Sequence, residues 1–345
     1  MGERVQGRQD DTPRMTGPGK VAVIGAGAWG TALALQALRA GGDGQAVTLW
    51  AREPARALSI GALRENARHL PGILLPLALE VTADARAALA GASLAILAVP
   101  TQHLGAVLAG LRGLPPCLVV AKGVETGTLR FPLEILAEAH PDLPTAILSG
   151  PNFAHEVAAG LPAAAVLAGT DPALREAAMA RLASPGFRLY AGTDPLGVQV
   201  AGAAKNVAAI AAGAVMGAGL GENARAALVT RCLAEIARLA VALGGRAETV
   251  AGLSGLGDLM LTCAGAGSRN FSLGFALGRG EAAADVLAGR HSVTEGVATA
   301  PALLARAARA GVELPVCAAV AAVLDGSLAV GDAVDRLMGR PARAE

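Results

Sequence analysis

The chain has 345 residues, of which 53% are hydrophobic and only 2% aromatic, and its formal net charge is +1. This length allows two domains and a sizeable core, which small aliphatic side chains must fill. A nearly balanced charge gives no sign of a nucleic-acid partner or of attraction to a charged membrane surface.

Three features predict a cytoplasmic protein. Residues 1–19 are polar and charged without an apolar core, so we expect a disordered leader and not a signal peptide. The apolar stretch Val198–Leu220 contains Lys205 and many small residues, which favours a core helix over stable membrane insertion. The four cysteines are scattered without a C-x-x-C pair and are expected to be reduced thiols.

A glycine-rich turn follows the first predicted strand. Val21–Ile24 is a short apolar run typical of a buried parallel strand, and Ala32–Arg39 has the composition of a helix. Gly25, Gly27 and Gly30 lie between them in G-x-G-x-x-G spacing. Such glycines allow a tight turn, close approach of a pyrophosphate and close packing of helix on strand, while N–H groups at the helix start face the phosphates. The placement of the glycines between strand and helix predicts a dinucleotide cofactor.

The end of the next predicted strand bears on the choice of cofactor. Ala46–Trp50 is followed by Arg52 and Glu53, where an acid would bind a ribose 2′-hydroxyl. A guanidinium suits a 2′-phosphate instead. The sequence therefore favours NADPH, with NADH possible and an ordinary surface arginine as the alternative.

Strands and helices alternate through the rest of the first half. This alternation predicts an α/β fold with a doubly wound parallel sheet and right-handed crossovers. Lys122 directly follows a strand, at the sheet edge where ligands bind. The predicted helices are Arg56–His69, a short helix within Val81–Ala90, Gln102–Leu111, Leu129–Glu138 and 171–181, and the predicted strands are Leu94–Val99, Leu118–Ala121, Ala146–Leu148, Ala163–Ala168 and Arg188–Ala191.

Helical periodicity dominates from Asp194 onward. We therefore expect a disordered leader over 1–19, a Rossmann-type dinucleotide-binding domain over 20–193 and an all-α substrate and catalytic domain over 194–340. Its predicted helices are Val198–Leu220, Ala224–Leu243, Thr249–Gly252, Asn270–Leu277, Val297–Ala310, Pro315–Leu324 and Gly331–Met338.

Lys205 is the strongest catalytic candidate. It lies among small apolar residues, where burial would disfavour its charged form and lower its pKa. That suits a proton donor to a forming alkoxide and a base in the reverse direction. The alternative is a lysine that extends to the surface from a buried helix. Asp258 would orient Lys205, or would simply cap a helix.

A second constellation lies at Ser268-Arg269-Asn270, before a run of alternating apolar residues. A helix N-terminus with an added guanidinium binds phosphate, although simple helix capping explains the same pattern. Glu295 would accept a hydrogen bond from the cofactor, or would be a solvated loop carboxylate. No two of the five histidines have metal-ligand spacing, so no metal is expected.

Seven blocks in order resemble the bacterial NAD(P)-dependent glycerol-3-phosphate dehydrogenase family, from about Lys20 to about Leu337. Asn152 stands where that family usually has Ser or Thr. The blocks are GAGAWGTALA (Gly25–Ala34), AKGVE (Ala121–Glu125), SGPNFAHEV (Ser149–Val157), AKNVAAIAAG (Ala204–Gly213), GLGDLMLTC (Gly255–Cys263), SRN (Ser268–Asn270) and VTEG (Val293–Gly296).

The resemblance implies a cytoplasmic, homodimeric enzyme that reversibly reduces dihydroxyacetone phosphate to sn-glycerol 3-phosphate for phospholipid synthesis. The residues and the resemblance together give the expected site. The catalytic residues are Lys205, Asp258 and Lys122. The cofactor-binding residues are Gly25, Gly27, Ala28, Trp29, Gly30, Arg52, Lys122, Ala154, Arg269, Val293 and Glu295. The substrate-binding residues are Lys122, Gly150, Asn152, Lys205, Asn206, Asp258, Thr262, Ser268, Arg269 and Asn270.

Two other functions remain open at this point. One is a dehydrogenase of the same architecture that acts on a 3-hydroxy acid or a nucleotide sugar, which would use the same lysine and a cationic anchor. The other is a non-catalytic NADPH-binding sensor, which would bind the cofactor without turnover and has no need of a lysine inside an apolar helix.

Overall fold

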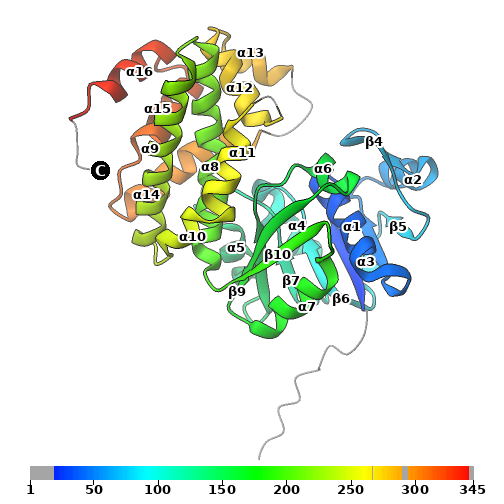
Figure 1. The fold of residues 1–345 in the computed structure, drawn as a ribbon. Coiled ribbons are helices and arrows are strands. Elements are labelled where there is room, and N and C mark those ends of the chain that lie inside the picture. Colours follow the sequence, from blue (N-terminus) through cyan, green and yellow to red (C-terminus); the bar gives the residue numbers. More distant parts are fainter. Residues whose placement is uncertain (1–18, 266, 290–293, 342–345) are drawn as a thin grey trace, which may run out of the picture.

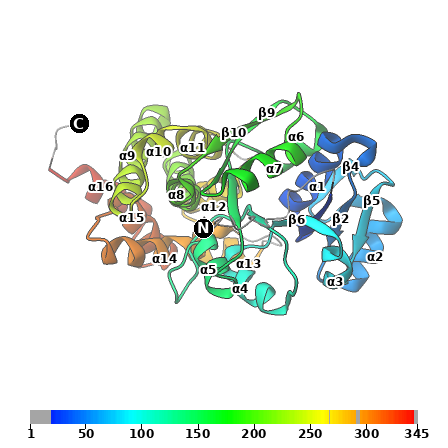
Figure 2. The same ribbon diagram turned by 90° about the horizontal axis from the view of Figure 1, so that it is seen from below.

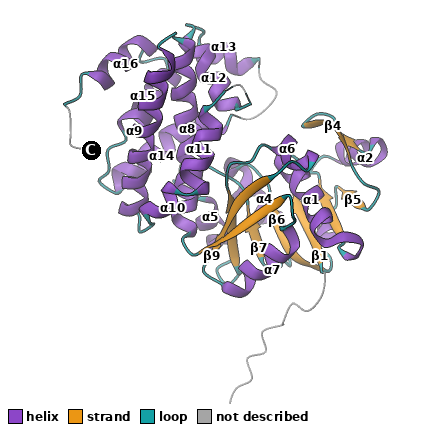
Figure 3. Ribbon diagram, in the orientation of Figure 1, coloured by secondary structure: helices purple, strands orange, loops and turns teal. Residues whose placement is uncertain are grey.

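The computed structural model describes residues 19–265, 267–289 and 294–341. They form one lobe built on a β-sheet and one built of helices alone (Figure 1; Figure 3). The expected leader over 1–19 lies outside the described residues except for Gly19, and so does Val293.

The sheet has eight strands in the order β10-β9-β8-β7-β6-β1-β2-β5. Every neighbouring pair is parallel except β8 and β9, so β9 and β10 run against the other six. The predicted Rossmann-type sheet is confirmed, with this antiparallel addition at one side. The strands are β1 (Lys20–Ile24), β2 (Val47–Trp50), β5 (Leu79–Thr82), β6 (Ala92–Leu97), β7 (Cys117–Val119), β8 (Thr145–Ser149), β9 (Ala163–Gly169) and β10 (Phe187–Gly192).

Helices cover both faces of the sheet (Figure 2). Val21 and Val23 of β1 pack in one core with α1, α6 and α7, whereas Ala22 and Ile24 pack in another with α3, α4 and α5. Because both faces are buried, the strands consist of continuous apolar runs and not of alternating ones. The helices are α1 (Ala28–Gly41, followed by η1, Gly42–Gly44), α3 (Ala85–Leu89), α4 (Thr101–Gly110), α5 (Pro132–Ala139), α6 (Ala154–Ala159) and α7 (Pro172–Leu182).

The predicted helix over Arg56–His69 is wrong in its second half. Helix α2 (Pro54–Leu63) ends at Arg64, which has a left-handed φ of 51°, and the hairpin β3 (Glu65–Asn66) and β4 (Leu70–Leu74) follows. The Arg64 guanidinium donates to the carbonyl groups of Leu75, Pro76 and Leu79. These contacts offset the cost of the left-handed backbone, and they form only after the hairpin has folded back.

The short helix predicted within Val81–Ala90 is confirmed as α3, while Val81 and Thr82 belong to β5. Helix α3 begins only after Asp84, whose side chain accepts hydrogen bonds from the N–H groups of Arg86 and Ala87. Two short helices, α6 and α13, have no counterpart among the predicted elements.

The helical lobe surrounds α8 (Pro195–Gly217). Among the described residues, α8 is the one helix long and apolar enough to cross a membrane, but 89% of its most apolar window is buried inside the protein. The other elements of the helical lobe are α9 (Gly221–Ala242), α10 (Ala247–Ala251), η2 (Leu253–Gly257), α11 (Asp258–Cys263), α12 (Arg269–Gly278), α13 (Ala283–Ala288), α14 (Glu295–Arg309), α15 (Pro315–Leu324) and α16 (Val330–Met338).

The two lobes meet where α8 begins and where α14 passes α5. Asp194 caps α8, since its Oδ1 accepts from the N–H of Gly197 at 2.8 Å, and its Oδ2 accepts from the N–H of Arg246 at 2.9 Å. Farther along, Arg306 of α14 pairs with Glu134 of α5 at 2.6 Å. These contacts fix the direction in which α8 leaves the sheet.

We expect Asp194→Ala to lower the free energy of unfolding by about 2 kcal/mol, because it removes a helix cap and a second buried hydrogen bond. Urea denaturation followed by circular dichroism measures this. The matched control is Asp171→Ala, which removes a cap of α7 with a single bond, to Ala173, and should cost about 1 kcal/mol. Equal losses in the two variants would contradict a contribution from the second hydrogen bond of Asp194, to Arg246.

Candidate active site

The glycine turn fits a dinucleotide. A Cβ at Gly30 would lie 2.0 Å from the carbonyl oxygen of Gly25, and Gly25 itself has a φ of 120°, so neither position accepts a side chain. A Cβ at Gly27 would meet nothing within 4 Å, which leaves open space beside the turn. Gly27 is the N-cap of α1 and no side chain caps the helix. The first N–H groups of α1, at Ala28 and Trp29, are thus available to a phosphate.

Two residues that were not among the predicted site residues hold this turn. Asn66 donates to the carbonyl oxygen of Ala26 at 2.9 Å and to Thr31 Oγ1 at 2.8 Å, and Arg56 also donates to Ala26. Both lie in the segment predicted as one helix, and the turn that brings Asn66 under the glycines was therefore missed. Arg52 is exposed just past the end of β2, where the sequence placed it.

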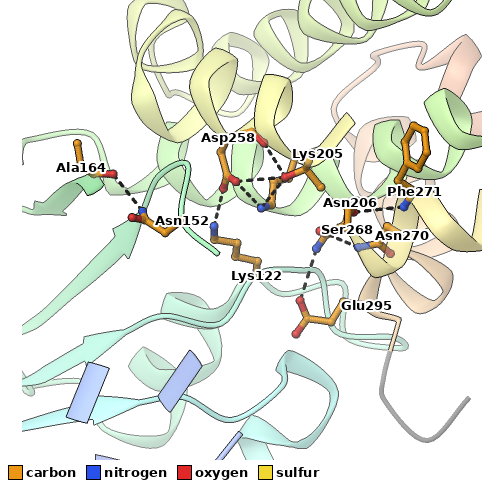
Figure 4. A network of polar contacts seen from close by, with 11 residues as sticks. Lys122, Asn152, Ala164, Lys205, Asn206, Asp258, Ser268, Asn270, Phe271 and Glu295 are labelled. Carbon is orange, nitrogen blue, oxygen red and sulfur yellow. Dashed lines mark hydrogen bonds and ion pairs between the residues drawn. The ribbon is translucent and has the colours of Figure 1, made fainter. Parts of the chain in front are cut away.

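Three predicted catalytic residues form one ion cluster (Figure 4). Asp258 is fully buried, and its two carboxylate oxygens lie 2.5 Å from Lys122 Nζ and 2.5 Å from Lys205 Nζ respectively. Lys205 also donates to Thr262 Oγ1 at 3.1 Å. Lys122 comes from the end of β7, Lys205 from the middle of α8 and Asp258 from the start of α11, so the cluster forms only when the two lobes are together.

The cluster has two positive charges around one negative charge. Burial lowers the pKa of Lys205 from 10.5 to about 8, with Asp258 opposing and Lys122 adding to this change. Burial alone would raise the pKa of Asp258, but the two ammonium groups lower it below its ordinary value. Lys205 is therefore the member able to exchange a proton near neutral pH, while Asp258 stays ionised.

The local backbone explains how Asp258 reaches both amines. The π-helical turn η2 precedes α11, and a Cβ at Gly255 within it would lie 1.9 Å from the carbonyl oxygen of Val250. Wide turns of this kind recur at functional sites. The alternative role of Asp258 as a helix cap is wrong, since Gly257 is the N-cap of α11 and no side chain caps it.

A second polar network lies beside the cluster (Figure 4). Asn270 donates to Asn206 Oδ1 at 3.0 Å and accepts from the N–H of Gly296 at 3.1 Å, and Asn206 approaches Glu295 at 3.5 Å. Burial raises the pKa of Glu295, against the opposing charges of Arg269, Lys122 and Lys205. Glu295 is also the first residue of α14. Because it lies in a helix and is removed from water, it is not a solvated loop carboxylate.

The SRN segment begins a helix, as predicted. Ser268 is the N-cap of α12, and its Oγ accepts from the N–H of Phe271 at 3.2 Å. Arg269 is exposed at the first position of α12, while Asn270 is buried. Capping is therefore present, and Arg269 lies beside the helix N-terminus, an arrangement suited to phosphate.

The segment after β8 places the remaining predicted residues. A Cβ at Gly150 would lie 2.8 Å from the carbonyl oxygen of Ala164, so this strand end passes close to β9. Asn152 donates to the same oxygen at 3.0 Å, whereas its Oδ1 is buried without a hydrogen-bond partner. Ala154 begins α6. The unpartnered oxygen makes Asn152 able to accept a hydrogen bond from a ligand.

Two further observations bear on the site. Burial, with Arg56, Arg68 and Arg269, lowers the pKa of His69 to about 4, so a neutral imidazole lies among arginines that come from both lobes. In the part of the chain that the structure describes, no group of three or more His, Cys, Asp or Glu residues is arranged to hold a metal ion.

The composition of the chain also points to this cluster. Lys20, Lys122 and Lys205 are the only lysines among the 29 Lys and Arg residues of the chain. Arginine stays charged in proteins, whereas the pKa of lysine changes readily on burial. Two of the three lysines lie in this one buried cluster, so the scarcity of lysine points to the cluster as the place where an amine is used.

Comparison with known proteins agrees with this geometry. Residues 20–175 match the model for the N-terminus of NAD-dependent glycerol-3-phosphate dehydrogenase, and residues 194–335 match the model for its C-terminus. A Rhodospirillum rubrum protein named glycerol-3-phosphate dehydrogenase (NAD(P)+) is 52% identical over 329 residues, covering 94% of this chain and 93% of its own. A Caulobacter vibrioides protein of the same name is 52% identical over 330 residues, covering 94% and 98%.

Solved structures give the same result. The crystal structure of glycerol-3-phosphate dehydrogenase from Coxiella burnetii is 36% identical, with a TM-score of 0.89 over 93% of this chain and 99% of that one. The corresponding structure from Saccharomyces cerevisiae is 26% identical, with a TM-score of 0.78 over 92% and 99%. Sequence, fold and the matched models together place this chain in the NAD-dependent glycerol-3-phosphate dehydrogenase family.

Proposed function

We propose that Lys205, held by Asp258 and Lys122, is the proton donor and acceptor of this oxidoreductase. As a member of its family the chain is an NAD(P)H-dependent glycerol-3-phosphate dehydrogenase, which interconverts dihydroxyacetone phosphate and sn-glycerol 3-phosphate. The proposal for Lys205 rests on one observation, the buried carboxylate of Asp258 shared by two amines at 2.5 Å.

The glycine turn and the N-terminus of α1 would hold the pyrophosphate of the cofactor, and Arg52 the 2′-phosphate of NADPH. Ala154 of the sheet lobe, and Arg269 and Glu295 of the helical lobe, would complete the cofactor site. The bound cofactor supplies the hydride that the carbonyl carbon of the substrate accepts.

Lys205 gives its proton to the carbonyl oxygen as that oxygen becomes an alkoxide, and takes it back during oxidation. Asp258 remains ionised throughout and holds the amine of Lys205 in place. Lys122 would stabilise the developing negative oxygen through its ammonium group. Thr262 accepts from Lys205 and so restricts its rotation.

The start of α12 would bind the phosphate of the substrate. Arg269 offers a guanidinium there, and the N–H groups of the first turn add the positive end of the helix dipole. Asn206 and Asn270 would bind the substrate next to this anchor, with Gly150 and Asn152 on the side of the sheet. A substrate bound at both ends presents its carbonyl to Lys205.

The organisation of the protein is part of the same proposal. The dinucleotide-binding domain spans 20–193 and the substrate domain 194–340. A cytoplasmic homodimer that supplies phospholipid synthesis is supported by the family resemblance. Leucines with 65–88% exposure at α2, β4 and the turn before β5 offer an apolar contact surface (Leu58, Leu63, Leu74 and Leu77). Light scattering in solution tests the dimer.

Lys205→Ala should lower kcat for dihydroxyacetone phosphate by about 10³-fold, because general acid catalysis is lost. Absorbance at the nicotinamide band gives the rate, and fluorescence titration should give an unchanged Kd for NADPH. The control is Lys20→Ala, which removes the amine that donates to Ala87 and Ala90 beside β1. Near-normal turnover of Lys205→Ala would rule out its role.

The rates should follow the titration of Lys205, whose pKa is about 8. Reduction needs the protonated amine, so its kcat/KM should be high below pH 8 and fall above it. Oxidation needs the free amine and should rise over the same range. Asp258→Asn removes the charge that raises the pKa of Lys205, so the midpoint should move to lower pH. Asp171→Asn, on α7, should leave both profiles in place, and an unmoved midpoint in Asp258→Asn would contradict the coupling.

Arg52→Ala should raise KM for NADPH about tenfold, the loss expected for one charge-assisted phosphate contact of about 1.5 kcal/mol. KM for NADH should change little, since that cofactor has no 2′-phosphate. Arg188→Ala, an exposed arginine on β10 that lies over Tyr190, is the control. An equal rise for both cofactors would show that Arg52 does not distinguish them.

A further inference from the structure

Helices α8 and α12 touch backbone to backbone. A Cβ added at any of four glycines in their crossing would lie about 2 Å from a carbonyl oxygen of the facing helix, far inside normal contact. These distances are 2.0 Å from Gly213 to Phe271, 2.1 Å from Gly217 to Phe275, 1.9 Å from Gly274 to Ile210 and 2.2 Å from Gly278 to Ala214. Each glycine lowers the stability of its helix by about 1 kcal/mol relative to alanine, so the close approach of α8 and α12 comes with a loss of helix stability.

The contacts form a regular ladder. Gly274 faces Ile210 and Gly278 faces Ala214, so both helices advance by four residues and run parallel. One step back along each helix pairs Asn270 with Asn206, and these two side chains are hydrogen-bonded at 3.0 Å. The asparagine pair therefore continues the same series of contacts and is the member that lies at the active site. We call this series, which consists of the asparagine pair and the four glycine contacts, the glycine ladder, and each contact in it a rung.

A third helix, α14, packs against the asparagine pair. A Cβ at Gly296 of α14 would lie 2.6 Å from Asn270 Oδ1 and 2.9 Å from the carbonyl oxygen of Asn206. The start of α14, with Glu295, is consequently placed by the spacing of α8 and α12. The side chains of Asn270 and Ile210 already fill the space around Gly296, since the added Cβ would also lie 2.8 Å from Ile210 Cδ1, so little adjustment is available there.

We propose that the glycine ladder sets the distance between the groups that bind the two ends of the substrate, and we call this its role as a ruler. Lys205, which acts on the carbonyl, belongs to α8, and the start of α12, which would bind the phosphate, is set at a fixed distance from it by the ladder. This fixed distance would then favour a ketone with one carbon between carbonyl and phosphate ester, as in dihydroxyacetone phosphate. This inference rests on the proposed roles of Lys205 and of the SRN segment, and it makes the four glycines positioning residues.

Gly274→Ala tests the ruler, because its new Cβ must push α12 away from α8 by about 1 Å. Displacements of that size cost up to about 100-fold in rate, so kcat/KM for dihydroxyacetone phosphate should fall by 10- to 100-fold, mainly through KM. The second substrate is erythrulose 4-phosphate, which has one more carbon between carbonyl and phosphate. Its kcat/KM should fall less or rise, and the ratio of the two values should shift toward it by about tenfold.

The ratio separates positioning from mere destabilisation. A structural defect reduces the active fraction and lowers both values together, so an unchanged ratio would overturn the proposal. Gly61→Ala is the matched control, a helical glycine of α2 whose added Cβ would meet nothing within 4 Å, and it should leave the ratio unchanged.

Two further outcomes are distinguishable. If Gly274→Ala does not fold, Gly278→Ala at the distal rung decides, with a smaller shift of the ratio expected and no shift overturning the ruler. If the wild-type protein does not reduce dihydroxyacetone phosphate, the proposed function fails before the ruler is tested.

Discussion

One carboxylate shared by two amines is the interaction on which the site depends. Asp258 has no solvent exposure, and its charge is tolerable there only because Lys122 and Lys205 each bind one of its oxygens. Removing either lysine would leave a buried charge incompletely paired, which is strongly unfavourable. The three residues come from the sheet edge, the central helix and the turn after η2, so the stability of the cluster and the alignment of the lobes are the same physical requirement. The surplus positive charge then favours a substrate that develops negative charge on oxygen.

The scarcity of aromatic residues explains how the helical lobe can position groups so closely. Where glycine and alanine replace large side chains, helices approach until their backbones meet, and the separation no longer depends on rotamers. Helix α8 uses this along its length, with Gly202 near Lys122 and Gly213 against α12. The same helix is apolar enough to resemble a membrane span, but its apolar surface is used for contacts within the lobe.

Much of the fold was predictable, because local signals there agree with the final structure. The first strand, glycine turn and helix need no distant partner, and Pro315 marks the start of α15 correctly. The errors lie where distant contacts decide. Arg64 takes a left-handed φ because carbonyl groups ten or more residues later accept from its guanidinium. The pairings of Lys122 with Asp258 and of Asn206 with Asn270 join residues 136 and 64 positions apart. The sequence identified these residues as candidates, but no spacing rule specifies which of them meet.

The rarity of lysine gives the chain an unusual chemical surface. Of its three side-chain amines, Lys20 donates to two carbonyl groups beside β1, and Lys122 and Lys205 are only 16% and 12% exposed within the cluster. Acylating reagents, and cellular acyl donors of the same reactivity, therefore find few competing targets on this protein. Acylation of either buried amine would remove its charge and leave Asp258 with one partner. Two of the three side-chain amines of the chain thus lie where a change in their charge acts directly on the carboxylate of Asp258.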